Sequence, residues 1–103
     1  MSKWVEICTP NEIAHDEYKF VTIDNTPIAV FNVDGQFCAI QDNCPHQHMP
    51  IADGFVENGT ITCPYHHAKF DLRTGEVLAP PACENLTTYP TRLQAGKIEI
   101  EID

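Results

Sequence analysis

Cysteine and histidine gather in one short stretch of this sequence. Four of the five histidines lie between positions 46 and 67, and two of the five cysteines lie between 44 and 63. They form two arms with sixteen residues between them, Cys44-Pro45-His46 and Cys63-Pro64-Tyr65-His66. Each arm offers one thiolate and one imidazole, which are ligands for iron, iron–sulfur clusters and zinc. The spacing predicts a metal centre held by four side chains: Cys44, His46, Cys63 and His66.

The mixed composition of the arms separates the candidate metals. Structural zinc sites with two cysteines and two histidines typically place the cysteines in one knuckle and the histidines in the other. Here each arm holds one of each, and the Cys-x-His spacing of the first arm is tighter than the usual knuckle. Mixed arms suit two loops that approach a binuclear centre from opposite sides. A structural zinc module that serves as an interaction domain stays open as the alternative.

The elements that must position the arms read as strands. Runs of β-prone residues flank turn signals at Asp34-Gly35, Asn58-Gly59, Thr74-Gly75 and Ala95-Gly96, which predicts four hairpins. Their ranges are 28–40, 55–63, 70–78 and 88–102, and two further strands are expected at 4–8 and 19–24. The second hairpin fills the gap between the arms, so it returns the chain to its starting point and places the arms side by side. We therefore expect an all-β, antiparallel fold.

Composition limits the classes of function. The 103 residues fit one domain, and 43% apolar residues suit a globular chain. Six basic against fifteen acidic residues give a formal charge of -9, which argues against a nucleic-acid partner. The N-terminus has no apolar signal region, and no apolar run approaches the length of a membrane span. We expect a cytoplasmic protein without a membrane partner, in which clustered cysteines bind metal rather than form disulfides.

The ligand pattern resembles a known family. Cys44-x-His46 and Cys63-x-x-His66, with a hairpin-sized gap, look like the motif of Rieske [2Fe–2S] proteins, in which two His replace two Cys on one iron. The segment from His66 to Asp71, Thr74-Gly75 and the Ala-Pro-Pro-Ala run at 79–82 is similar to Rieske-type ferredoxins of bacterial aromatic-ring dioxygenase systems. The similarity extends over essentially the whole chain.

The resemblance implies a fold and a cofactor. The expected fold is a Rieske-type β-sandwich over residues 1–103, with a cluster-binding subdomain formed by the two Cys/His loops at approximately 41–83. The expected cofactor is one [2Fe–2S] cluster per chain, ligated by Cys44, His46, Cys63 and His66.

The resemblance also implies a function. The chain would be a soluble, monomeric one-electron carrier between an NADH-dependent flavoprotein ferredoxin reductase and a terminal Rieske oxygenase that hydroxylates an aromatic ring. It would not be an enzyme itself, because it is too short to hold the mononuclear-iron domain of the oxygenase. A small subunit of a nitrite-reductase-type complex is the alternative. A carrier never touches the aromatic substrate, so the sequence does not identify it.

Four positions predict a subtype. High-potential Rieske proteins join the arms by a disulfide, but the corresponding positions here are Met49 and Tyr65. Those relatives also carry a Ser and a Tyr whose hydroxyls bond cluster sulfur, where this chain has Ala68 and Phe70. Fewer donors stabilise the reduced cluster less, so we expect a reduction potential nearer about -150 mV than +300 mV.

The remaining cysteines and histidines receive plainer interpretations. Cys8 and Cys38 lie in expected strands and should be small buried apolar residues. His15 stands in a polar stretch and should be solvated. His48 and His67 occupy positions where the family commonly has glycine, and we interpret them as exposed loop residues. An extra ligand or a proton-coupled group is the alternative for both.

Overall fold

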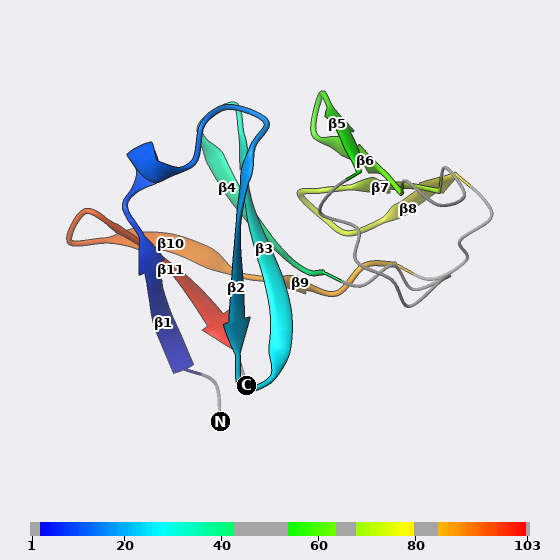
Figure 1. Ribbon diagram of the computed structural model, residues 1–103. Coiled ribbons are helices and arrows are strands. Elements are labelled where there is room, and N and C mark those ends of the chain that lie inside the picture. The colour runs from blue at the N-terminus through cyan, green and yellow to red at the C-terminus, as the bar shows by residue number, and fades with distance from the viewer. Residues whose placement is uncertain (1–2, 43–53, 64–67, 80–84, 103) are drawn as a thin grey trace.

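The chain folds almost entirely into β-strands, as the computed structural model shows for residues 3–42, 54–63, 68–79 and 85–102 (Figure 1). One 3₁₀ turn, η1, spans Pro10–Glu12. The strands are β1 Lys3–Cys8, β2 Tyr18–Ile23, β3 Thr26–Val33, β4 Gln36–Gln41, β5 Phe55–Glu57, β6 Thr60–Thr62, β7 Lys69–Asp71, β8 Val77–Ala79, β9 Thr88–Tyr89, β10 Thr91–Gln94 and β11 Lys97–Ile102. The all-β prediction is confirmed.

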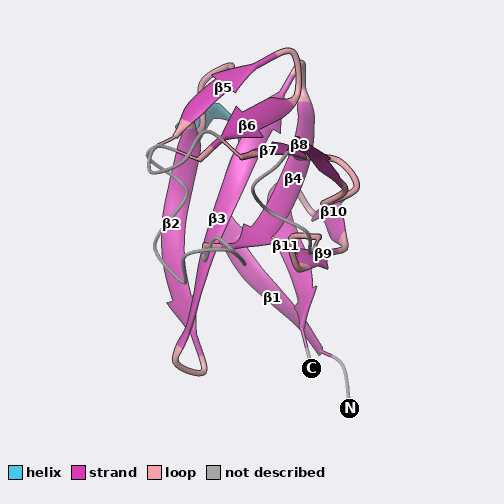
Figure 2. Ribbon diagram, turned by 90° about the vertical axis from the view of Figure 1, so that its right-hand side faces the viewer, coloured by secondary structure: helices cyan, strands magenta, loops and turns pink. Residues whose placement is uncertain are grey.

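The strands form three antiparallel sheets. Their orders are β1-β11-β10, β2-β3-β4-β9 and β5-β6-β7-β8. We call them the three-stranded sheet, the central sheet and the small sheet. The small sheet stands to one side of the other two in Figure 1, and Figure 2 shows the central strands running behind it. Within the described residues, no helix is long and apolar enough to cross a membrane.

The central sheet is covered on both faces, and this explains its sequence. Ile28 and Val30 pack in one core cluster with Ile98, Ile100 and Ile102 of the three-stranded sheet. Ala29 and Phe31, which alternate with them along β3, pack in a second cluster with residues of the small sheet. A strand segment buried on both faces needs apolar residues at successive positions, which accounts for the apolar run at residues 28–31 of β3.

Two-residue turns close the predicted hairpins. Asp34 and Gly35 have φ values of 53° and 85°, and Asn58 and Gly59 have 53° and 79°. Two successive positive φ values fit a type I′ turn, whose twist matches that of the flanking strands. The hairpins predicted at Asp-Gly and Asn-Gly are therefore present where the sequence indicates them.

The last predicted hairpin needs a correction. The expected strand from 88 to 93 is interrupted at Pro90, because β9 pairs with β4 while β10 pairs with β11. Proline has no N–H to continue a ladder. Its carbonyl instead accepts a hydrogen bond from the Glu101 N–H at 2.9 Å. The chain therefore changes from the central to the three-stranded sheet at this residue.

Candidate metal centre

Cys63 is the one predicted ligand that lies among the described residues, since Cys44, His46 and His66 fall outside them. Its side chain is fully buried, and its backbone N–H donates to the Ala68 carbonyl at 2.7 Å. This bond continues the β6–β7 ladder one step beyond the pair Thr62↔Lys69. The small sheet therefore holds Cys63 and Ala68, which flank residues 64–67, side by side.

The end of the first arm meets the same edge. Gly54 is the first described residue after that arm, and Phe55, next to it, pairs with Thr62. Gly54 therefore lies at the end of the small sheet from which Cys63 leaves. The β5–β6 hairpin returns the chain to its starting point, as predicted from the gap between the arms. Residues 43–53 and 64–67, which include the predicted ligands Cys44, His46 and His66, lie outside the described residues.

The preceding end of the first arm is anchored on the central sheet. The N–H of Gln41, the last residue of β4, donates to the Thr87 carbonyl at 2.9 Å. The next residue, Asp42, is buried and donates its N–H to the Pro27 carbonyl at 2.9 Å. Two bonds to different segments fix the chain where it leaves the central sheet.

The shell around Cys63 is apolar. Ala68 and Phe70 are both fully buried in the same core cluster as Cys63, together with Ile61 and Leu72. The two positions identified as lacking hydroxyls thus lie in the core that the small sheet forms with the central sheet. An apolar shell disfavours an added negative charge more than a polar one does. The low-potential subtype itself stays a prediction from sequence.

The donor chemistry of Cys63 fits an iron–sulfur cluster. Its thiol is free of any disulfide, and iron–sulfur clusters are held by cysteine thiolates. Among the residues that the structure describes, no three His, Cys, Asp or Glu side chains come together as a metal site. All four ligands therefore stay predictions from sequence, and Cys63 is the one whose surroundings the structure describes.

A polar joint that the sequence did not reveal fastens the small sheet to the central sheet. Arg73, in the β7–β8 turn, donates through Nε to Oε1 of Gln36 at 3.0 Å. Its guanidinium occupies the space that a Cβ at Gly59 would need. The Gly59 carbonyl accepts the Leu72 N–H at 2.8 Å. The Asn-Gly signal predicted the turn, but nothing local indicated that Arg73 packs against it.

Cys8, Cys38 and the isolated His15 behave as predicted, whereas Cys83 lies outside the described residues. Cys8 and Cys38 are each 6% exposed. Burial raises the pKa of the Cys38 thiol above 9.0. Burial, and to a lesser extent the negative charge of Glu12, raises the pKa of the Cys8 thiol above 9.0. The His15 side chain is 61% exposed and lies 3.3 Å from Asp16 and 3.5 Å from a second carboxylate. His48 and His67 lie outside the described residues.

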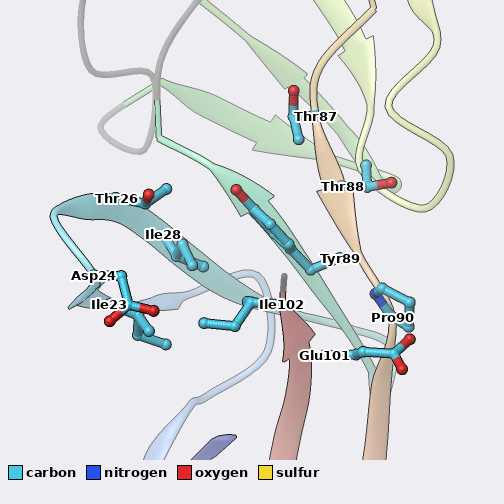
Figure 3. A pocket seen from close by; sticks show the side chains of 10 residues that line it. All are labelled: Ile23, Asp24, Thr26, Ile28, Thr87, Thr88, Tyr89, Pro90, Glu101 and Ile102. Atoms are coloured by element: carbon cyan, nitrogen blue, oxygen red, sulfur yellow. The ribbon is translucent and has the colours of Figure 1, made fainter. Parts of the chain in front are cut away.

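A cavity of about 380 Å³ opens between the central and three-stranded sheets (Figure 3). Figure 3 shows the Tyr89 ring extending from β9 toward Ile28 of β3. Burial raises the pKa of the Tyr89 hydroxyl above 10.0. Cys63 is not among the described residues that line this cavity, so we do not connect it with the metal centre. Its lining residues are Ile23, Asp24, Thr26, Ile28, Thr87, Thr88, Tyr89, Pro90, Glu101 and Ile102.

Known proteins resemble the chain in both sequence and fold. It is 43% identical over 88 residues to the 3-phenylpropionate/cinnamic acid dioxygenase ferredoxin subunit of Escherichia coli, covering 84% of this chain and 83% of the relative. The Sphingomonas yanoikuyae B1 ferredoxin superposes with a TM-score of 0.90 at 27% identity, covering 98% of this chain and 100% of the other.

A solved complex contains a third similar chain. It is the complex of reduced oxygenase and oxidized ferredoxin in carbazole 1,9a-dioxygenase, and the matching chain has a TM-score of 0.89 at 24% identity, covering 94% of this chain and 91% of the other. This likeness concerns the fold. Residues 3–90 match the family described as "Rieske [2Fe-2S] domain". The match covers most of the sequence and includes both Cys/His arms, so the chain belongs to the Rieske [2Fe–2S] domain family.

Proposed function

We propose that this chain is the electron-carrying ferredoxin of a multicomponent aromatic-ring dioxygenase. The observation that carries the proposal is the 43% identity to a dioxygenase ferredoxin subunit over 84% of the chain. Electrons would arrive from an NADH-dependent flavoprotein ferredoxin reductase and leave to a terminal Rieske oxygenase. The chain supplies no hydroxylation chemistry of its own and is an electron-transfer component.

We further propose that one [2Fe–2S] cluster is held by Cys44, His46, Cys63 and His66. When bound, the cluster supplies a one-electron couple. The chain's own contribution would be to hold the residues that flank the arms at one end of the small sheet and to surround Cys63 with apolar side chains. A buried ligand such as Cys63 in a fixed apolar shell needs little rearrangement when an electron is gained or lost, which suits rapid transfer.

The proposed carrier is a single domain over residues 1–103, monomeric and cytoplasmic. Its charge of -9 favours partners with basic surface regions and argues against nucleic acid. We place its potential toward the low end of the Rieske range, since Ala68 and Phe70 offer no hydroxyl to the cluster sulfurs. A redox titration that gives a clearly positive value would contradict this subtype.

Reconstitution tests the carrier role. The purified holoprotein is mixed with the reductase and terminal oxygenase of the Escherichia coli 3-phenylpropionate dioxygenase, and NADH-dependent formation of the dihydrodiol is measured. We expect product only when the chain is present. Iron and sulfide analysis should give two of each per chain, whereas a zinc module would contain neither. A chain that accepts no electron from the reductase and passes none to the oxygenase would overturn the proposal.

Exchange of ligands tests the site. Cys63→Ser and His66→Ala should each abolish the Rieske spectrum, while Cys38→Ser, which alters a buried thiol outside the set, should retain it. Retention of the spectrum by His66→Ala would remove that residue from the ligand set. Loss of the spectrum in Cys38→Ser, with the strands still formed by circular dichroism, would show that the assignment by spacing is incomplete.

A further inference from the structure

A short segment of the chain contacts both the small sheet and the central sheet. Residues 85–87, which we call the bridging segment, lead into β9 and form the orange stretch that precedes it in Figure 1. The middle residue, Leu86, is buried in the same core cluster as Cys63. The bridging segment therefore packs in the core that surrounds the one predicted ligand that the structure describes.

Two hydrogen bonds hold the bridging segment to the small sheet. Oδ1 of Asn85 accepts a hydrogen bond from the Val77 N–H at 3.0 Å, and the Leu86 N–H donates to the Gly75 carbonyl at 2.7 Å. Val77 begins β8, which is an edge strand, and Gly75 lies in the turn between β7 and β8. An edge strand has N–H groups that no neighbouring strand accepts. The Asn85 side chain supplies the acceptor that the sheet itself lacks at Val77.

The turn and the bridging segment lie in close contact at Gly75. A Cβ at this residue would lie 2.5 Å from the Leu86 carbonyl oxygen and 2.7 Å from Cγ2 of Thr88. The carbonyl oxygen belongs to the backbone and cannot rotate away as a side chain can. Glycine therefore allows the close approach, and the Asn85 hydrogen bond fastens it.

The other end of the bridging segment reaches the start of the first arm. The Thr87 carbonyl accepts the Gln41 N–H at 2.9 Å, and the next residue, Thr88, pairs with Ile40. Gln41 ends β4 and precedes the predicted ligand Cys44 by three residues. A continuous set of hydrogen bonds thus runs from β8 through the bridging segment to the strand that leads into the first arm.

The central and small sheets are therefore joined at both ends of β4. The Arg73–Gln36 hydrogen bond joins them where β4 begins, and the bridging segment joins them where it ends. The second joint matters more for the predicted metal centre. The first arm leaves the central sheet after β4, whereas Cys63 directly follows β6 of the small sheet. One cluster can be held by both only if the two sheets keep a constant separation there.

We propose that Asn85 is a positioning residue for the predicted metal centre. Its side-chain amide fastens β8 to the bridging segment and so fixes the small sheet relative to the start of the first arm. This role rests on the proposed ligand set. Asn85 touches neither the cluster nor a ligand in this scheme, and it acts through Leu86, Thr87 and Gln41.

Iron release from the holoprotein tests the role. The holoprotein is mixed with dithionite and an excess of an iron chelator, and the rate of iron release is measured. We expect Asn85→Ala to accelerate release about fivefold, as loss of one hydrogen bond would. Asn85→Asp keeps an oxygen that can accept the Val77 N–H, so its rate should stay within about twofold of the wild type.

Two variants are matched controls. Oγ1 of Thr74 accepts the Glu76 N–H at 3.2 Å within the same β7–β8 turn, without reaching the bridging segment. Thr74→Ala should therefore leave iron release within about twofold. Ile100→Val trims the other core and lowers overall stability by an amount similar to the loss of one hydrogen bond, but it should not accelerate iron release.

The EPR spectrum of the reduced cluster supplies a readout that overall stability does not move. If the two sheets lose their fixed separation, the ligands adopt a wider range of positions and the lines broaden. We expect broader lines in Asn85→Ala and wild-type lines in Asn85→Asp and Ile100→Val.

The contrary outcomes are distinct. A wild-type rate of iron release or unchanged EPR lines in Asn85→Ala would overturn the positioning role. Equal acceleration by Ile100→Val would show that release follows overall stability, and it would overturn the role as well. A wild-type preparation that contains neither iron nor sulfide would instead contradict the proposed ligand set itself.

Discussion

The two layers that cover the central sheet are built differently. The three-stranded sheet uses strands of up to six residues, and β11 buries Ile98, Ile100 and Ile102 in strict alternation with glutamates. The small sheet has strands of only three residues. Short strands make few ladder bonds and bury little surface by themselves. The three-stranded sheet is therefore held mainly by its strands. The small sheet depends on its turns, on the Arg73–Gln36 hydrogen bond to the central sheet and on the proposed cluster.

The largest expected effect is loss of the cluster. Removing iron with a chelator should raise amide hydrogen exchange in the small sheet by about 100-fold or more, because metal binding contributes folding free energy to the region it holds. Exchange in the three-stranded sheet should change little. Hydrogen exchange read by NMR or mass spectrometry provides the measurement. Equal loss of protection in both layers would mean that they unfold as one unit.

Core truncation on each side sharpens the contrast. Phe70→Ala and Ile100→Ala each remove a fully buried side chain, and each should lower the free energy of unfolding by about 3–4 kcal/mol. The two should differ in cluster retention, because Phe70 shares its core with Cys63 and Ile100 does not. Urea titration measures the stability, and bleaching of the visible spectrum over time measures retention. Faster bleaching in Ile100→Ala would contradict the separation of the two cores.

Substitution of two turn glycines measures how much the packing of Arg73 against the Gly59 turn restricts that turn. Gly35 and Gly59 both have positive φ, but a Cβ at Gly35 meets nothing within 4 Å, whereas a Cβ at Gly59 would collide with the Arg73 guanidinium. Gly35→Ala should cost about 1 kcal/mol of backbone strain, and Gly59→Ala about 2 kcal/mol or more. The difference should shrink in the background of Arg73→Ala. Equal costs in the wild-type background would show that Arg73 moves aside freely.

The smallest effect is expected beside the three-stranded layer, in the turn that follows β1. The Thr9 N–H donates to the Glu12 carboxylate at 2.9 Å, and this bond lowers the pKa of Glu12 below 4.5. A lowered pKa stabilises the fold above the unfolded-state pKa, and this contribution is lost as the pH falls through the folded-state pKa. Glu12→Gln should therefore lower the Tm slightly at pH 6, and this difference should shrink as the pH falls through the folded-state pKa of Glu12. Glu17→Gln, at an exposed carboxylate, is the control. A difference in Tm between Glu12→Gln and the wild type that stays the same at pH 6 and at lower pH would contradict the charge-based explanation.

Much of the fold could be predicted because its determinants are local. Asp34-Gly35 and Asn58-Gly59 specify their turns by residues that tolerate positive φ, and β11 shows its buried face by alternation. Pro90 shows the limit of such reasoning. Its missing N–H is visible in the sequence, but the pairing of β9 with β4 depends on packing between distant strands.

The candidate site also combines features that depend on local sequence with features that depend on packing between distant residues. The ligand set is predicted from residue type and spacing alone and stays a prediction; of its members, the structure describes Cys63, which is buried. The Arg73–Gln36 bond joins residues 37 positions apart, and no local pattern marks either side chain. Such contacts are decided by how two sheets meet, which the sequence of neither sheet reveals alone.

The sharing of β3 between two cores has a consequence for redesign. Ile28 and Val30 belong to one cluster, and Ala29 and Phe31 to the other, so each substitution in this strand alters a boundary common to both layers. The small sheet and the three-stranded sheet each contribute to one cluster only. An engineer could therefore tune the redox properties in β6 and β7 and the heat tolerance in β1 and β11 as nearly independent traits, provided that β3 is left unchanged.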